Sequence, residues 1–153
     1  MADHILECRL WLPRPREDVF PFLADPGSLA SLTPSRLGLR LLSASPNPFE
    51  AGAVFDFRIR WLGLPLRWRT LIREYDPPYR FVDVQLLGPY ARWEHRHMFR
   101  EGNGGTWVED RITYRLPLGP LGRLLHALLV GRQLKAVFAY RRQRLEEIFR
   151  AAR

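Results

Sequence analysis

Two histidines, His95 and His97, are the residues of this sequence best suited to chemistry. They lie in segment 93–99, where aromatic or histidine side chains alternate with charged or long ones. Because successive side chains of a β-strand point to opposite faces, the segment predicts one solvated face and one inward face that carries both histidines. A histidine changes its charge near neutral pH, so this pair could act on a substrate, orient a bound group or simply fill a core.

Asp110 is the acidic residue that could work with these histidines. Segments 91–100 and 106–116 both alternate, and the glycine-rich stretch between them predicts a hairpin turn. Across an antiparallel ladder of this kind, Asp110 would lie near His95 or His97. The spacing therefore predicts a buried cluster of imidazoles and a carboxylate.

Asp83 and Gln85 share one face of the strand predicted at 79–87, and they would extend this cluster if that face points inward. Three roles stay open for it. The polar side chains can satisfy one another, since buried polar groups are normally hydrogen-bonded. They can orient a carbonyl or hydroxyl of a hydrophobic ligand. Finally, a histidine oriented by Asp110 can serve as the base of an aldol cyclisation or dehydration, which makes Asp110 and the two histidines the catalytic candidates.

Other chemistries have less support in the sequence. His-x-His on a strand is a metal-ligand spacing, but a zinc site needs three or four ligands and His126 lies far away on the predicted C-terminal helix, so we predict no metal. The chain has no Ser–His or Cys–His nucleophile pairing, phosphate loop or dinucleotide fingerprint, and we predict no cofactor. Cys8 has no cysteine partner and is expected to be a small hydrophobic strand residue.

Alternation and turn residues predict the elements that must position the cluster. A first strand is followed by two short helices, a run of about six antiparallel strands and one long helix; the strands are expected at 4–12, 37–43, 53–61, 66–75, 79–87, 91–100 and 106–116. Pro46, Asn47 and Pro48 predict a loop. From Leu121 the period becomes helical, and the inward stripe of this helix, roughly 45 Å long, includes Arg141. Gly131 is the position where the helix could kink.

The basic charge follows the strands. The net charge is +8, and all but one of the 24 basic residues are arginines. They recur at alternate strand positions and are interleaved with acidic residues, which predicts a solvated outer face with cross-strand ion pairs. A transient contact with an anionic membrane surface remains an alternative, whereas no motif for nucleic acid accompanies the charge, so we predict no nucleic-acid partner.

Length and apolar patterning point to one domain over residues 1–153. No apolar run approaches the ~18 residues needed to cross a bilayer, and the first residues carry no signal-peptide pattern. We therefore expect a cytoplasmic protein. The oligomeric state, monomer or homodimer, stays open.

The order of elements and several short motifs resemble the START/Bet v 1-like superfamily, also called SRPBCC. The likeness covers nearly the whole chain and is closest to a group of small bacterial ligand-binding or polyketide cyclase/dehydrase-like proteins. The residues that carry it are Leu32-Thr33-Pro34, Phe81-Val82-Asp83-Val84-Gln85 with Gly88-Pro89, Trp93-Glu94-His95-Arg96-His97-Met98-Phe99, Gly105-Thr106 with Asp110, Tyr114-Arg115-Leu116-Pro117-Leu118-Gly119, and Phe138-Ala139-Tyr140-Arg141. The resemblance implies an α+β helix-grip fold, with a curved antiparallel sheet around the long C-terminal helix and a hydrophobic cavity between them.

The predicted function is binding, and possible transport, of a hydrophobic small molecule such as a lipid or a polyketide-like compound. A cofactor-free cyclase or dehydratase and a lipid-transfer or membrane-recruited subunit are the alternatives, because the fold alone does not specify a reaction. The predicted ligand-binding residues are Phe55, Phe57, Trp61, Trp68, Phe81, Asp83, Gln85, Trp93, His95, His97, Asp110, Tyr114 and Phe138. Stretch 121–130 is apolar on more than one side and is expected to be buried by the sheet and the rim loops; a patch that touches a membrane or a partner is the alternative.

Overall fold

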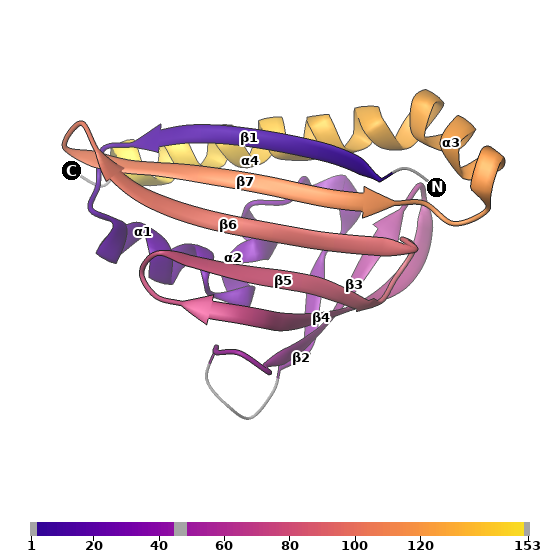
Figure 1. Ribbon diagram of the computed structural model, residues 1–153, viewed down its shortest axis with the longest axis horizontal. Coiled ribbons are helices and arrows are strands. Elements are labelled where there is room, and N and C mark those ends of the chain that lie inside the picture. The colour runs from indigo at the N-terminus through magenta and orange to yellow at the C-terminus, as the bar shows by residue number, and fades with distance from the viewer. Residues whose placement is uncertain (1–2, 45–48, 152–153) are drawn as a thin grey trace.

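A seven-stranded antiparallel sheet curves around a long C-terminal helix in the computed structural model, which describes residues 3–44 and 49–151 (Figure 1). The strands are β1 (His4–Leu12), β2 (Arg40–Ala44), β3 (Val54–Trp61), β4 (Leu64–Asp76), β5 (Arg80–Leu87), β6 (Arg92–Gly102) and β7 (Gly105–Arg115). The helical elements are α1 (Arg16–Leu23), α2 (Pro26–Ser31), the 3₁₀ turn η1 (Ser35–Leu37), α3 (Gly119–Leu125), the π-helical turn η2 (His126–Val130) and α4 (Gly131–Ala151). The predicted α+β helix-grip fold is confirmed.

The strand order is β1-β7-β6-β5-β4-β3-β2, so neighbours in sequence pair from β2 to β7 and β1 returns beside β7. Figure 1 shows α4 running along β1 and β7, while α1 and α2 lie on the path from β1 to β2. The concave face of the curved sheet is apolar and must be covered by another element. The long helix α4 covers it. This arrangement places the inward side chains of β3–β6 opposite α4.

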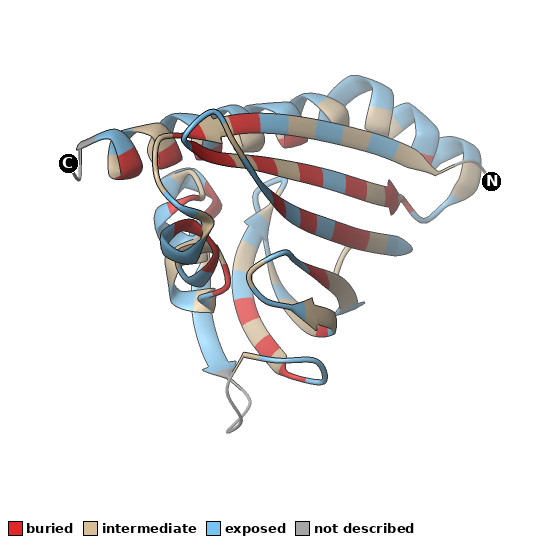
Figure 2. Ribbon diagram, turned by 60° about the vertical axis from the view of Figure 1, so that its left-hand side comes forward, coloured by how far each residue is buried: buried red, intermediate tan, exposed pale blue. Residues whose placement is uncertain are grey.

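The strand register follows the predicted alternation. Buried and more exposed residues alternate along β6 and β7 (Figure 2). In the β6–β7 ladder His97 lies directly opposite Asp110, and in the β5–β6 ladder Asp83 lies directly opposite His95. The hairpin closes at Asn103 and Gly104, which both have positive φ as a tight hairpin turn requires.

The convex face carries the predicted ion pairs. Arg69 Nε donates to Asp56 Oδ1 at 2.8 Å, and Glu94 accepts Arg96 Nε at 3.0 Å and lies 3.1 Å from Arg73 Nη2. The arginines of these pairs are 43–48% exposed, so solvent screens each pair and its contribution to stability is small, about 0–1 kcal/mol. The alternation of arginines thus reflects a solvated sheet face rather than a binding groove.

Apolar clusters close both ends of the space between sheet and helix. At one end Phe20 packs edge-on against Phe81 and Phe99, with Leu145 and Phe149 of α4 behind them. At the other end the cluster is built from Tyr90, Ile112, Tyr114, Leu116, Val130 and Leu134. Each fully buried side chain of this size stabilises the fold by about 1.5–3 kcal/mol.

Several details differ from the sequence-based prediction. Stretch 121–130, expected to be buried, exposes Leu121, Leu124, Leu128 and Leu129 by 49–57%. The second strand begins at Arg40 rather than 37, because η1 ends at Gly38, whose φ of 54° is a left-handed conformation. The C-terminal helix contains a π-helical turn instead of a simple kink, with the Gly131 N–H bonded to the His126 carbonyl five residues earlier. The loop predicted at Pro46–Pro48 lies outside the described residues. Over the described ranges, no helix combines the length and apolar character that crossing a membrane requires.

Candidate functional site

A cavity of about 160 Å³ lies between the sheet and α4, and we call it the α4 cavity. Its apolar walls include five of the predicted aromatic residues, Phe57, Trp61, Trp68, Trp93 and Phe138. Three of the predicted polar residues, Asp83, His95 and His97, also line it. A concave apolar space with a few convergent polar groups is the usual form of a small-molecule site.

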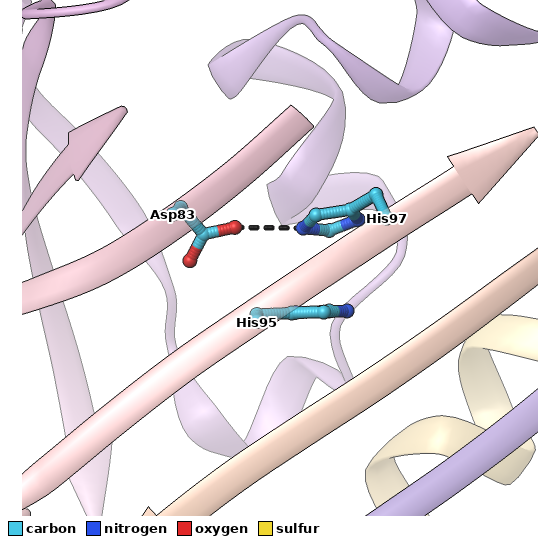
Figure 3. Close-up of side chains that lie close together, drawn as sticks. All are labelled: Asp83, His95 and His97. Atoms are coloured by element: carbon cyan, nitrogen blue, oxygen red, sulfur yellow. Dashed lines mark hydrogen bonds and ion pairs between the residues drawn. The ribbon is translucent and has the colours of Figure 1, made fainter. Parts of the chain in front are cut away.

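The two histidines bond to two different carboxylates. Nε2 of His95 donates to Oδ1 of Asp110 at 2.7 Å, and Nε2 of His97 donates to Oδ2 of Asp83, also at 2.7 Å. The assignment of donor follows from chemistry, because an ionised carboxylate can only accept. Figure 3 shows Asp83 reaching from β5 to His97, with the ring of His95 lying parallel below. Strand alternation and register alone bring these four side chains together.

Burial and neighbouring charges separate the two histidines electrostatically. Burial, together with the charge of His97, lowers the pKa of His95 to about 4, so His95 is neutral at neutral pH. Burial also opposes the charged form of His97, but the carboxylates of Asp110 and Asp83 outweigh it and raise the pKa of His97 above its ordinary value. One ring is therefore a neutral donor and the other carries a positive charge.

The two carboxylates stay ionised in this environment. Burial opposes ionisation of Asp110, but the Arg141 guanidinium and the two histidines hold the pKa of Asp110 well below its usual value. Burial likewise opposes ionisation of Asp83, and the hydrogen bond from His97 outweighs it and lowers the pKa of Asp83. The cluster thus contains two anions, Asp83 and Asp110, and two cations, His97 and Arg141.

Arg141 is the main site residue that sequence reasoning did not select. It lies on α4, is only 6% exposed, and its Nη2 is 3.6 Å from Oδ1 of Asp110. The signal was present, because an arginine on the inward stripe of a helix needs a buried partner. The sequence-based prediction also missed other residues that line the cavity. They come from segment 29–39, from the sheet and its turns, and from α4: Leu29, Leu32, Thr33, Leu37, Leu39, Ile59, Thr70, Tyr90, Gln133, Leu134 and Val137.

Five predicted ligand contacts lie outside the lining of the α4 cavity. Phe55 and Phe81 line a smaller adjoining cavity of about 70 Å³, which shares Asp83, His97 and Arg141 with the first. Asp110 lies behind the histidines and lines a groove between β1 and α4.

The other two make internal hydrogen bonds. Gln85 bonds through its amide to the backbone N–H and carbonyl of Tyr90, at 3.1 and 2.8 Å, and so positions a wall residue. The Tyr114 hydroxyl bonds to Nε2 of His126 at 2.6 Å. A role for Gln85 and Tyr114 in ligand contact stays a prediction.

Asp83, His95 and His97 could also offer ligand atoms to a cation, since one atom of each lies within 4.8 Å of the others. Both Nε2 atoms already donate to carboxylates, and Arg141 and protonated His97 already balance the two anions. This charge balance disfavours a further cation, and the absence of a metal stays a prediction.

Comparison with known proteins places the chain in a family. The family described as polyketide cyclase / dehydrase and lipid transport matches residues 12–138. No curated protein is significantly similar to the chain. Among solved structures, TTHA0849 from Thermus thermophilus is 20% identical with a TM-score of 0.71, covering 93% of this chain and 97% of its own.

Two further structures share the fold. A START superfamily protein from Mycobacterium smegmatis is 13% identical with a TM-score of 0.71, covering 95% of this chain and 99% of its own. The di-domain ARO/CYC StfQ from the steffimycin biosynthetic pathway is 16% identical with a TM-score of 0.74, covering 98% of this chain and 52% of its own. At these identities the structures support the fold, while the family match covers most of the sequence. The chain therefore belongs to the polyketide cyclase / dehydrase and lipid transport family.

Proposed function

We propose that this protein binds a small hydrophobic molecule in the α4 cavity and orients it through the polar cluster. The observation that carries the proposal is the cavity itself, with aromatic walls and a charge-balanced His–Asp–Arg cluster along one side. Apolar walls supply affinity by removing ligand surface from water, and the few polar groups select its orientation. Membership of the family supports binding of a hydrophobic molecule in general terms.

Tryptophan fluorescence tests this proposal directly. Trp61, Trp68 and Trp93 line the cavity, so an aromatic probe that enters it should change their emission in a saturable way. A Val137→Trp variant would place a large side chain into the same space and should abolish probe binding. Ala136→Trp, at an exposed position on the same helix, is the matched control and should bind as the wild type does. Saturable binding that Val137→Trp leaves unchanged would contradict the proposal.

A cyclase or dehydratase is the second candidate, favoured by the His95–Asp110 pair. Neutral His95 lines the cavity, and its bond to Asp110 would stabilise the imidazolium that forms when His95 takes a proton from carbon beside a carbonyl. Arg141 could stabilise the developing oxyanion. Full turnover of an identified substrate by both His95→Ala and His97→Ala variants would end this idea.

A lipid-transfer role that includes membrane contact is supported by a separate feature. The leucine ridge, Leu121, Leu124, Leu128 and Leu129, is 49–57% exposed on α3 and η2 and lies next to Arg123. Co-sedimentation with anionic vesicles, reversed by salt, would be expected of such a surface. No binding even at low salt would count against it.

A further inference from the structure

Arg141 is a buried cation whose own partners do not satisfy it. Its Nε is buried and has no hydrogen-bond partner among the described residues. The nearest carboxylate oxygen, Oδ1 of Asp110, is 3.6 Å from Nη2, and that oxygen already accepts Nε2 of His95 at 2.7 Å. A separation of 3.6 Å is longer than a hydrogen bond. A buried guanidinium carries five N–H donors and normally has most of them bonded.

The side chain of Arg141 borders the interior cavities. Arg141 lines both the α4 cavity and the adjoining cavity of about 70 Å³, so a bound molecule in either can reach it. The Cζ atom of Arg141 lies over the Phe138 ring, 5.6 Å from its centre, so the guanidinium also borders an aromatic wall of the α4 cavity. A planar fork of donors matches a carboxylate better than a single carbonyl oxygen.

The volume of the cavity limits the size of the partner. At about 160 Å³ it is close to an engineered apolar cavity of about 150 Å³ that takes up one benzene molecule. Its walls bring Trp68, Trp93 and Phe138 around that space. These dimensions suit a molecule with one ring or a short chain, and not a fused multi-ring system in this conformation.

We propose that the ligand of the α4 cavity is a small hydrophobic carboxylic acid, with one ring or a comparable chain, whose carboxylate is bound by Arg141. This inference rests on the proposed binding function and narrows it to a chemical class. The aromatic walls enclose the apolar part of the acid, and the guanidinium fixes its acidic end beside the histidines.

Charge balance gives the proposal a second signature. The groups that face His95 are Asp83 from β5, Asp110 from β7, His97 on its own strand and Arg141 from α4, two anions and two cations. Cys8 of β1, near Asp110, has a raised pKa and stays neutral. A carboxylate that enters adds one negative charge, which favours the charged form of His97 and raises the pKa of His97 further, whereas His95 stays neutral. Affinity for the acid should therefore fall as pH rises through the range in which His97 loses its proton.

Calorimetry with phenylacetate and its neutral isostere phenylacetamide tests the class of ligand. We expect the wild type to bind the acid at least about tenfold more tightly than the amide at neutral pH. Affinity for the acid, and not for the amide, should fall as pH rises above neutrality, where His97 loses its charge. Arg141→Gln should lose the preference, Arg141→Lys should keep part of it, and Arg132→Gln, an exposed position on the same helix, should behave as the wild type.

The outcomes separate this inference from the proposed function. Equal binding of acid and amide at neutral pH would overturn the carboxylate proposal and leave hydrophobic binding in place. Because this comparison uses the wild type alone, it does not depend on whether Arg141→Gln folds. If neither probe nor any neutral one-ring compound changed the tryptophan emission or gave heat, the binding function itself would fail, and the inference with it.

Discussion

The rings of His95 and His97 stack with their centroids 3.6 Å apart and their planes 22° apart, and each donates to a different carboxylate. Two protonated imidazoles could not lie this close without strong repulsion, so only one of them carries a proton beyond the neutral state. His97 has that charge, because it lies between Asp83 and Asp110, at 2.7 and 3.4 Å. The pair is thus a fixed arrangement of one cation and one neutral ring beside a cavity.

This arrangement predicts that folding stability has a maximum close to pH 6.5. The ordinary pKa of both rings is 6.5, and folding lowers that of His95 to about 4. The unfolded chain then binds more protons below 6.5, so stability is lost as pH falls toward 4. Folding raises the pKa of His97, so its contribution is complete below 6.5 and is lost as pH rises through the higher value.

Thermal melting across pH measures this directly. His95→Asn should flatten the acid side of the profile, and His97→Asn the alkaline side. A wild-type melting temperature that stays constant between about pH 5 and 8 would contradict the assigned charges.

Asp110 should be the most sensitive polar position of the fold. Asp110→Asn would leave Arg141 and His97 with one carboxylate between them in a buried site, and breaking a buried ion pair costs roughly 3–5 kcal/mol of unfolding free energy. Asp56→Asn is the control, because Asp56 pairs with Arg69 on the convex face, where the loss should be about 1 kcal/mol or less. Urea denaturation of both variants gives the comparison. Equal losses would show that the buried cluster is not the source of stability we assign to it.

Gln85 and Gly88 should act as one unit that shapes the cavity wall. A Cβ at Gly88 would lie 2.3 Å from Oε1 of Gln85, the atom that accepts the Tyr90 N–H. Gly88→Ala should therefore displace the Gln85 amide and cost about 1–3 kcal/mol, by leaving buried backbone groups of Tyr90 unsatisfied. Chemical denaturation should give Gln85→Ala a similar loss, and the double variant little more than either. Strictly additive losses would mean that the two residues act separately.

Chelation should leave the protein unchanged. Because the two carboxylates of the cluster are balanced by His97 and Arg141, we expect no bound transition metal. Elemental analysis of purified protein should find no stoichiometric metal, and treatment with a chelator should not alter melting or probe binding. One equivalent of zinc that is lost in His95→Ala would contradict this.

Strand alternation was enough to predict much of the site. A period of two placed His95, His97 and Asp110 on one inward face, and the predicted hairpin put Asp110 near one of the two histidines. The observed register sets it opposite His97. Asp83 was expected only conditionally, because the sequence does not say which face of β5 points inward. In the structure Asp83 pairs with His95 across β5 and β6, so the face of β5 that carries Asp83 is the inward one.

Arg141 and Gln85 show what alternation cannot predict. Which partner a buried arginine meets depends on how α4 crosses the sheet, and no local pattern contains that information. Gln85 lies on the same face of β5 as Asp83. Its amide nevertheless bonds to the backbone N–H and carbonyl of Tyr90, in the turn that follows β5. The contribution of Leu29, Leu37 and Leu39 likewise depends on where α2 and η1 pack against the cavity, which is a long-range property.

Native mass spectrometry of protein purified from its own host, followed by extraction, tests the central claim most directly. We predict a bound small molecule on the wild type and on Ala136→Trp, and none on Val137→Trp, in which the cavity is filled. A molecule that is bound equally by Val137→Trp would place the site elsewhere. A wild type that has no bound molecule and also fails to take up one-ring probes would contradict the claim that this cavity binds a ligand.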